Sequence, residues 1–123
     1  MPWEATRYAG VEAKTLLVDR RTGLLTVLLK MAPGAMLPDH EHVQIEQTFV
    51  IEGALVCGEG TCSAGNFVWR PAGSRHAAGT PNGALMLAIF QLPNKFFEAD
   101  RGPTDMLNQD WDEIWGAATA NQL

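Results

Sequence analysis

Basic residues are scarce in this sequence. Its 123 residues include nine Lys and Arg against 14 Asp and Glu, which gives a formal net charge of -5, and no stretch is rich in Lys or Arg. A nucleic-acid backbone and an anionic membrane surface both recruit clustered positive charge. The composition therefore argues against nucleic acid and against membranes as partners.

Long hydrophobic runs are also missing. The longest runs, such as residues 84–90, are far shorter than the roughly 20 apolar residues that span a bilayer. The N-terminal residues, Met1-Pro2-Trp3-Glu4, do not have the charged and then apolar pattern of a secretory signal. We therefore expect a cytoplasmic protein.

Cysteine is limited to Cys57 and Cys62, which have four residues between them. A hairpin with its turn at Glu59-Gly60 would let the two face each other, so a disulfide is geometrically conceivable. A reducing cytosol favours two free, mostly buried thiols instead. One cysteine pair without a second pair nearby is a weak indication of zinc.

What the sequence does contain is typical of one globular all-β domain over residues 1–123. Apolar residues make up 46% of the chain and charged residues 19%, and 12 Gly and seven Pro are scattered at short intervals, as in a domain with many turns. The candidate strands are short, at residues 15–19, 24–31, 47–52, 54–57, 66–70, 76–78 and 84–92. This pattern predicts a sandwich or a barrel without choosing between them.

After Pro93 the pattern changes. Residues 108–118 place Trp111, Ile114 and Trp115 at positions i, i+3 and i+4, which predicts one amphipathic C-terminal helix. Its tryptophans would most simply dock on the outside of the barrel, and a partner subunit is the alternative surface.

The sequence holds three histidines, and two of them form the triplet His40-Glu41-His42. On a helix, residues two apart point about 200° apart and cannot share an ion; on a strand they point to the same face, with α-carbons roughly 6–7 Å apart. That separation suits two imidazoles on one metal ion. Pro33 and Pro38 just upstream argue against a helix here.

Glu46 has the same strand parity as these histidines. A straight strand would nevertheless place it about 20 Å from His40. Either the chain bends between residues 43 and 45, or Glu46 is not a ligand but a solvated residue or a partner that orients a histidine. His76 must arrive from a distant strand.

Two motifs around these residues resemble those of the cupin superfamily. Residues 34–53 follow the first motif, which runs Gly, five residues, His-x-His, three or four residues, Glu, six residues, Gly. Residues 65–76 follow the second, which runs Gly, five residues, Pro-x-Gly, two residues, His. Beyond His76 the family pattern expects an Asn where this chain has Thr80, and Asn82 is out of register.

The resemblance implies an all-β, double-stranded β-helix (the cupin jelly-roll barrel), in which one divalent metal ion is held by His40, His42, Glu46 and His76. The spacing is also similar to that of the small cupin domain of ChrR-type anti-sigma factors and of stand-alone relatives, some of them β-diketone-cleaving dioxygenases. A homodimer is expected as well, because small barrels expose apolar sheet faces and similar cupins usually pair.

Three His and one Glu suit Fe²⁺, Zn²⁺, Mn²⁺, Ni²⁺ or Co²⁺. An octahedral ion keeps two open positions, as an oxygenase needs, whereas a tetrahedral ion would be fully satisfied, which suits a structural or sensing zinc. The first hypothesis is a metal-dependent dioxygenase, with Fe²⁺, acting on a small keto or hydroxylated substrate. The alternatives are a non-catalytic metal-dependent sensor or ligand-binding cupin, and a metal-dependent isomerase. No residue is assigned a catalytic role beyond the metal ligands.

Several other residues can be interpreted either as functional or as purely structural. Arg70, Gln44 and Gln91 could supply polar groups at the barrel mouth or simply lie at the surface. Phe67 and Trp69 are expected in the core rather than against a substrate. The motif glycines are interpreted as turn residues and not as a phosphate cradle: Gly34, Gly53, Gly65 and Gly73.

Overall fold

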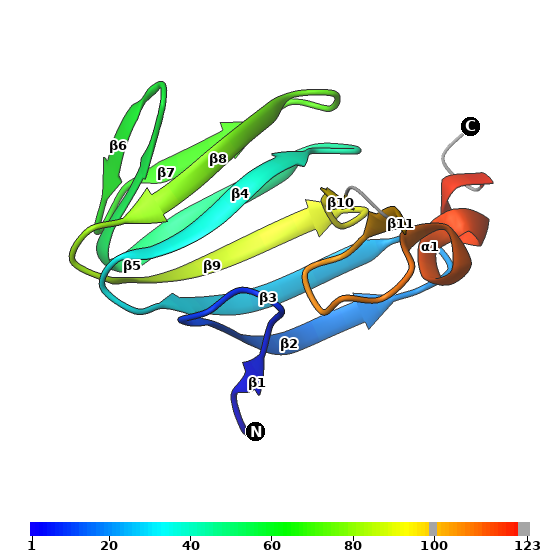
Figure 1. Ribbon diagram of the computed structural model, residues 1–123, viewed down its shortest axis with the longest axis horizontal. Helices are drawn as coiled ribbons and strands as arrows, with labels where there is room; N and C mark the ends of the chain where they lie inside the picture. Colours follow the sequence, from blue (N-terminus) through cyan, green and yellow to red (C-terminus); the bar gives the residue numbers. More distant parts are fainter. Residues whose placement is uncertain (99–100, 121–123) are drawn as a thin grey trace.

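The computed structural model describes residues 1–98 and 101–120 of the chain. Within these residues, eleven strands curl into one half-barrel sheet and one short helix follows at the C-terminal end (Figure 1). The strands are β1 (Glu4–Ala5), β2 (Val11–Asp19), β3 (Leu24–Met31), β4 (Ala35–Glu41), β5 (Glu46–Cys57), β6 (Gly60–Ser63), β7 (Phe67–Arg70), β8 (Arg75–Thr80), β9 (Ala84–Gln91), β10 (Lys95–Glu98) and β11 (Arg101–Thr104), and the helix is α1 (Trp111–Ala120). The expected all-β barrel with a short C-terminal helix is confirmed. In the described part of the chain, no helix has the length and apolarity needed to cross a membrane.

β5 is the longest strand and takes part in both sides of the barrel. Its first half pairs antiparallel with β7 and β9, and its second half pairs with β6 and β8. The change of partner occurs at a bulge between Val50 and Glu52, next to Gly53 at φ 75°. The two strands predicted at residues 47–52 and 54–57 are therefore one strand, bent at a glycine in the left-handed region.

The core follows the period of two that strand geometry imposes. On β9 the buried inward side chains are Ala84, Met86, Ala88 and Phe90. The neighbouring β3 adds Val27, Leu29 and Met31 to the same cluster. Because burial of one large apolar side chain contributes about 1.5–3 kcal/mol, this layer is a main source of stability and supports the strands that carry the histidines.

Phe67 and Trp69 do not lie in the core. Their side chains are 53% and 54% exposed, on the outer face of β7. Phe67 is paired across the sheet with Phe49, which is 44% exposed. The prediction of core positions was wrong because hydrophobicity alone does not say which face of an edge strand is covered. An apolar outer face suits the expected homodimer, which stays a prediction.

The β5–β6 hairpin turns one residue earlier than expected. Cys57 pairs with Gly60, so the two turn residues are Gly58-Glu59, and Cys62 pairs with Leu55. A turn at Glu59-Gly60 would have paired the two cysteines directly, and that prediction was wrong, because moving the turn by one residue shifts each cross-strand partner by two. Both cysteines are free, as expected, but they are partly exposed rather than mostly buried.

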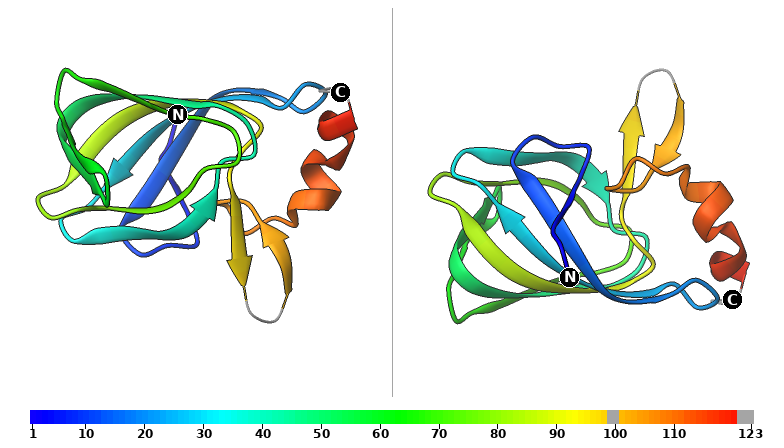
Figure 2. Two further views of the ribbon diagram at one scale, coloured as in Figure 1. Left: turned by 90° about the horizontal axis from the view of Figure 1, so that it is seen from above. Right: turned by 90° about the horizontal axis from the view of Figure 1, so that it is seen from below.

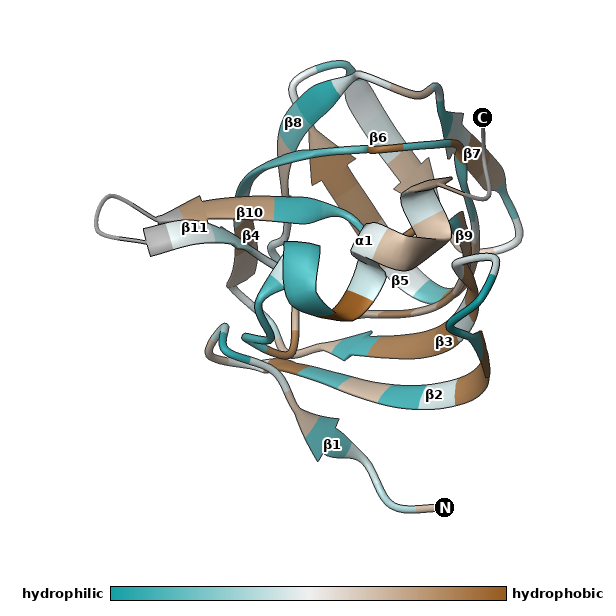
Figure 3. Cartoon of the chain, turned by 90° about the vertical axis from the view of Figure 1, so that its right-hand side faces the viewer, coloured by the Kyte–Doolittle hydropathy of each residue, from teal (hydrophilic) through white to brown (hydrophobic). Residues whose placement is uncertain are grey.

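α1 lies across one end of the barrel (Figures 2 and 3). It begins three residues later than expected because Asp110 caps it: Oδ1 of Asp110 accepts a hydrogen bond from the backbone N–H of Glu113 at 2.9 Å. Trp111 and Trp115 are buried, and Nε1 of Trp111 donates to the carbonyl of Pro93 at 3.0 Å. The tryptophans therefore dock on the chain's own barrel, as the simpler interpretation predicted.

Candidate metal site

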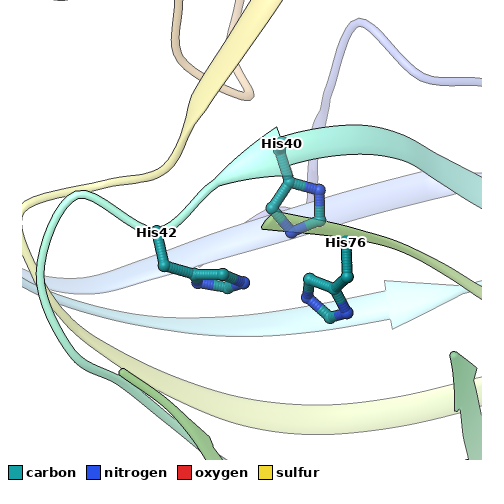
Figure 4. Close-up of side chains that lie close together, drawn as sticks. All are labelled: His40, His42 and His76. Atoms are coloured by element: carbon teal, nitrogen blue, oxygen red, sulfur yellow. The ribbon is translucent and has the colours of Figure 1, made fainter. Parts of the chain in front are cut away.

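β4 and β8 bring the three histidines together. His40 on β4 is paired directly with His76 on β8, and His42 lies one residue beyond the end of β4. The three ring centroids are 4.8–5.0 Å apart, and one potential ligand atom from each ring lies within 4.8 Å of the others. The rings point toward a common centre (Figure 4). The predicted meeting of these distant imidazoles is confirmed.

The local sequence explains this placement. A bulge lies between Leu37 and His40, and it contains Pro38, which has no backbone N–H to offer to a ladder. The bulge brings His40 into register with His76. Just beyond, the backbone of His42 is held on both sides: its N–H donates to the carbonyl of Ser74 at 2.8 Å, and its carbonyl accepts from Gly73 at 2.6 Å. The turn at Gly73 and Ser74, which belongs to the second motif, thus fixes the backbone of His42, which belongs to the first.

His40 has a defined tautomer. Its Nδ1 lies 2.8 Å from the carbonyl oxygen of Pro38. Since that oxygen can only accept, Nδ1 carries the proton and Nε2 keeps its lone pair. The ring is 2% exposed and packs against Phe96 with centroids 4.9 Å apart. His40 is therefore oriented to offer Nε2 to a ligand.

The other two rings have buried nitrogens without hydrogen-bond partners. His42 is fully buried, and neither of its ring nitrogens has a hydrogen-bond partner. Nδ1 of His76 is also buried without a hydrogen-bond partner. An unsatisfied buried polar group costs about 1–3 kcal/mol. Nitrogens around one transition metal ion lie roughly 3–3.5 Å apart, so small ring rotations suffice to place all three on one ion. The donor set therefore fits a divalent transition metal.

Burial keeps these imidazoles neutral. Desolvation lowers the pKa of His42 to about 3 and the pKa of His76 to about 4, and the neighbouring His40 adds to both shifts. Desolvation also lowers the pKa of His40 itself. At neutral pH all three rings are in the uncharged form that coordinates a metal, so a metal displaces no proton from them.

A bend between β4 and β5, one of the two alternatives that the sequence left open, brings Glu46 beside the histidines. The chain leaves β4 at Glu41 and enters β5 at Glu46, and Oε1 of Glu46 lies 3.6 Å from Nδ1 of His42. The side chain is 13% exposed, and burial raises its pKa to about 7. Glu46 can thus reach the site as a fourth ligand or orient His42, and its role as a ligand stays a prediction.

Asn94 is a site residue that the sequence reasoning missed. It is 5% exposed and follows β9, and its Nδ2 donates to Oε2 of Glu46 at 3.5 Å. No motif contains it. It enters the site because β10, which follows it, pairs with the β4 end that carries His40, and this long-range pairing has no signature in the local spacing.

The three polar residues considered for the barrel mouth have different positions. Nε2 of Gln91 donates to the carbonyl of Thr22 at 2.7 Å and ties down a loop. Gln44 is partly exposed in the bend before β5. Arg70 lies opposite Glu46 in the β5–β7 pairing, and its side chain is only 11% exposed. Of the three, Arg70 faces the interior near the histidines.

A cavity of about 320 Å³ is lined by neighbours of the candidate ligands, and not by the histidines or Glu46 themselves. Phe90, which is paired with Glu46, and Phe96, which is paired with His40, both line it, as does Asn94. On the other side it reaches Trp115 of α1. Its volume is in the lower part of the range for small-molecule sites.

The raised pKa of Glu46 leads to a prediction about proton release. The pKa of Glu46 is about 7, so its carboxyl is mostly protonated at a pH below 7, where the histidines are still neutral. A cation bound beside it favours the ionised form, so metal binding at pH 6 should release roughly one proton per ion, and at pH 8.5 almost none. Glu46→Gln should abolish the release at pH 6. Calorimetry in buffers of different ionisation enthalpy measures this number, and equal release by both proteins would contradict the assignment.

Comparison with known proteins points to one family. Residues 1–94 match the family described as the ChrR cupin-like domain. No curated protein matches the chain in sequence.

Solved structures share the fold. An RmlC-like cupin protein from Ralstonia eutropha JMP134 is 20% identical with a TM-score of 0.75, and the match covers 98% of this chain and 78% of that one. An acetylacetone dioxygenase from Acinetobacter johnsonii is 20% identical with a TM-score of 0.70, covering 90% and 78%. A chain of the Rhodobacter sphaeroides complex of SigE with the anti-sigma ChrR is 23% identical with a TM-score of 0.65, covering 73% and 48%. At these identities the likeness establishes the fold.

Proposed function

Because this chain belongs to the family of ChrR cupin-like domains, we propose that it is a metal-dependent enzyme of the dioxygenase type that acts on a small keto or hydroxylated substrate. The observation that carries the proposal is the group of three neutral imidazoles, two of them buried, in which His42 and His76 have buried nitrogens without hydrogen-bond partners. A divalent ion held there would supply Lewis-acid polarisation of a substrate oxygen and, as iron(II), redox chemistry with dioxygen.

The chain's own residues have separate tasks in this proposal. His40, His42 and His76 bind the ion, and Glu46 binds it or orients His42. Asn94 holds Glu46 through its amide N–H. Phe90 and Phe96 exclude water from the adjoining cavity, because both are almost fully buried aromatic residues.

The size of that cavity supports a small substrate. Its volume of about 320 Å³ suits a molecule of a few carbons, and its walls combine aromatic and aliphatic residues with polar and charged ones such as Asn94, Arg20 and Asp105. The structure is similar to that of an acetylacetone dioxygenase, a protein named for a small diketone, and this similarity agrees with a small keto substrate.

A second candidate is a sensor that binds a metal without turnover. Its support is the similarity to a chain of the SigE–ChrR complex, together with the family's name. The same three imidazoles together with Glu46 would then hold a four-coordinate ion such as Zn²⁺, with no open position for a substrate.

Oxygen uptake distinguishes the two candidates. Iron(II)-loaded protein is expected to consume about one dioxygen per molecule of pentane-2,4-dione or a related 1,3-diketone, because a dioxygenase incorporates both oxygen atoms. An oxygen electrode and product analysis measure this ratio, and zinc-loaded protein is the control without redox chemistry. A protein that binds iron stoichiometrically and consumes no oxygen with diketones or catechol-like compounds would favour the sensor.

A further inference from the structure

A positive charge lies inside the barrel beside the histidines. Arg70 is the last residue of β7, and the alternation along this strand turns Phe67 and Trp69 outward and Arg70 inward, opposite Glu46. Its side chain is 11% exposed. Glu46, which Arg70 faces, lies 3.6 Å from Nδ1 of His42, so the guanidinium belongs to a strand next to the candidate metal site.

The partner of this cation is a surface residue. Nη1 of Arg70 lies 2.5 Å from Oε2 of Glu59, and Nη2 donates to Sγ of Cys57 at 2.7 Å. The side chain of Glu59 is 70% exposed, and its backbone stands in the two-residue turn of the β5–β6 hairpin. A nearly buried guanidinium is therefore neutralised from outside by a residue of an exposed turn.

The position of the Glu59 carboxylate would allow another anion to take its place on the Arg70 guanidinium. A cavity of about 440 Å³ is lined by Arg70, Glu59 and both cysteines. The turn itself is loosely packed, since a Cβ added at Gly58 or Gly60 would meet no atom within 4 Å. The Glu59 carboxylate is 70% exposed and regains water when it leaves, and the guanidinium can then hold another oxyanion by two charge-assisted hydrogen bonds. An incoming anion can thus compete with the Glu59 carboxylate.

We propose that Arg70 binds the anionic oxygens of a small carboxylate or enolate in this cavity, and that Glu59 occupies the guanidinium until the ligand displaces it. The proposal goes beyond the proposed function, since Arg70 and Glu59 line the 440 Å³ cavity and not the 320 Å³ cavity next to the candidate metal site. The binding itself needs no turnover and is tested without it.

The test measures the binding of propionate and of its neutral analogue propionamide to the metal-loaded chain by NMR titration. Glu59→Gln removes the competing carboxylate and should tighten propionate binding roughly tenfold, as expected from the strength of hydrogen bonds to charged groups. Arg70→Gln should weaken it by a similar factor or more. Propionamide should bind weakly, and neither substitution should change its affinity.

Glu52→Gln is the matched control, because it removes the same charge from an exposed position on β5. If Glu52→Gln and Glu59→Gln tighten propionate binding equally, the effect comes from the change in net charge, and the proposal is overturned. Unchanged propionate binding in Arg70→Gln would place the anion on the metal and also overturn it. If Arg70→Gln does not fold, the comparison of propionate affinity between Glu59→Gln and Glu52→Gln is sufficient to test the proposal. Metal content, measured separately, reports on the proposed function and not on the anion site.

Discussion

Replacing His76 with alanine is expected to lower the affinity for a divalent metal by more than about 100-fold, because loss of a partner outside the ligand shell already costs 10–100-fold. In the proposed site His76 is the ligand that β8 contributes opposite His40, and the remaining pair, His40 and His42, would hold an ion far less tightly. Elemental analysis after dialysis against a competing chelator measures the loss. A second readout is thermal unfolding, since an ion at 1,000 times its Kd stabilises the folded state by about 4 kcal/mol and should do so only in the wild type.

Arg75→Gln is the control for this experiment. Arg75 precedes His76 on β8, but its side chain points outward and pairs with Asp39, with both side chains about half exposed. Loss of this pair should cost less than about 1 kcal/mol and leave the metal content unchanged. His76→Asn keeps a polar side chain if the alanine variant folds poorly. Metal stoichiometry that is the same in the His76 variants and the wild type would refute the site.

Replacing Gly53 with alanine is expected to destabilise the fold by about 3 kcal/mol or more, or to prevent folding. Gly53 has φ 75°, and a Cβ built on it would lie against the carbonyl oxygen of Gly83 at 2.0 Å. Two costs therefore add: the left-handed conformation of a residue with a Cβ, and a collision with backbone that cannot move aside without breaking the β5–β9 pairing. Chemical denaturation and the yield of folded protein measure the effect.

Gly34→Ala separates these two costs. Gly34 has φ 84°, similar to Gly53, but a Cβ there meets no atom within 4 Å. This variant should lose only the conformational cost, about 1–2 kcal/mol. Equal destabilisation by the two substitutions would mean that the close approach of β5 to the Gly83 turn is not required for the fold.

The meeting of the three histidines was largely predictable from short-range patterns. The direction of side chains on a strand alternates with period two, so His40 and His42 share a face wherever that strand lies. The bend before Glu46 was one of two alternatives, because a straight strand would have carried the carboxylate too far from His40 to share a ligand sphere. The glycines and the proline of the two motifs marked the turns that return His76.

The interactions around that site were not predictable in the same way. The positions of Asn94 against Glu46, of Phe96 against His40 and of Arg70 opposite Glu46 depend on which strands become neighbours and in what register. A shift of one residue in the β5–β6 hairpin also separated the two cysteines that the sequence would have let pair.

By itself, the sequence determined the all-β class, the amphipathic C-terminal segment and a set of imidazoles two of which face the same way, because alternation and turn chemistry are local properties of the chain. Only the tertiary structure decided that the outer face of β7 carries Phe67 and Trp69, that Asn94 and Arg70 enter the interior, and that Glu59 neutralises Arg70 from a turn. The physical reason is that sheet register and the coverage of each face arise from contacts between segments far apart along the chain, and these contacts leave no periodic trace in the residues that make them.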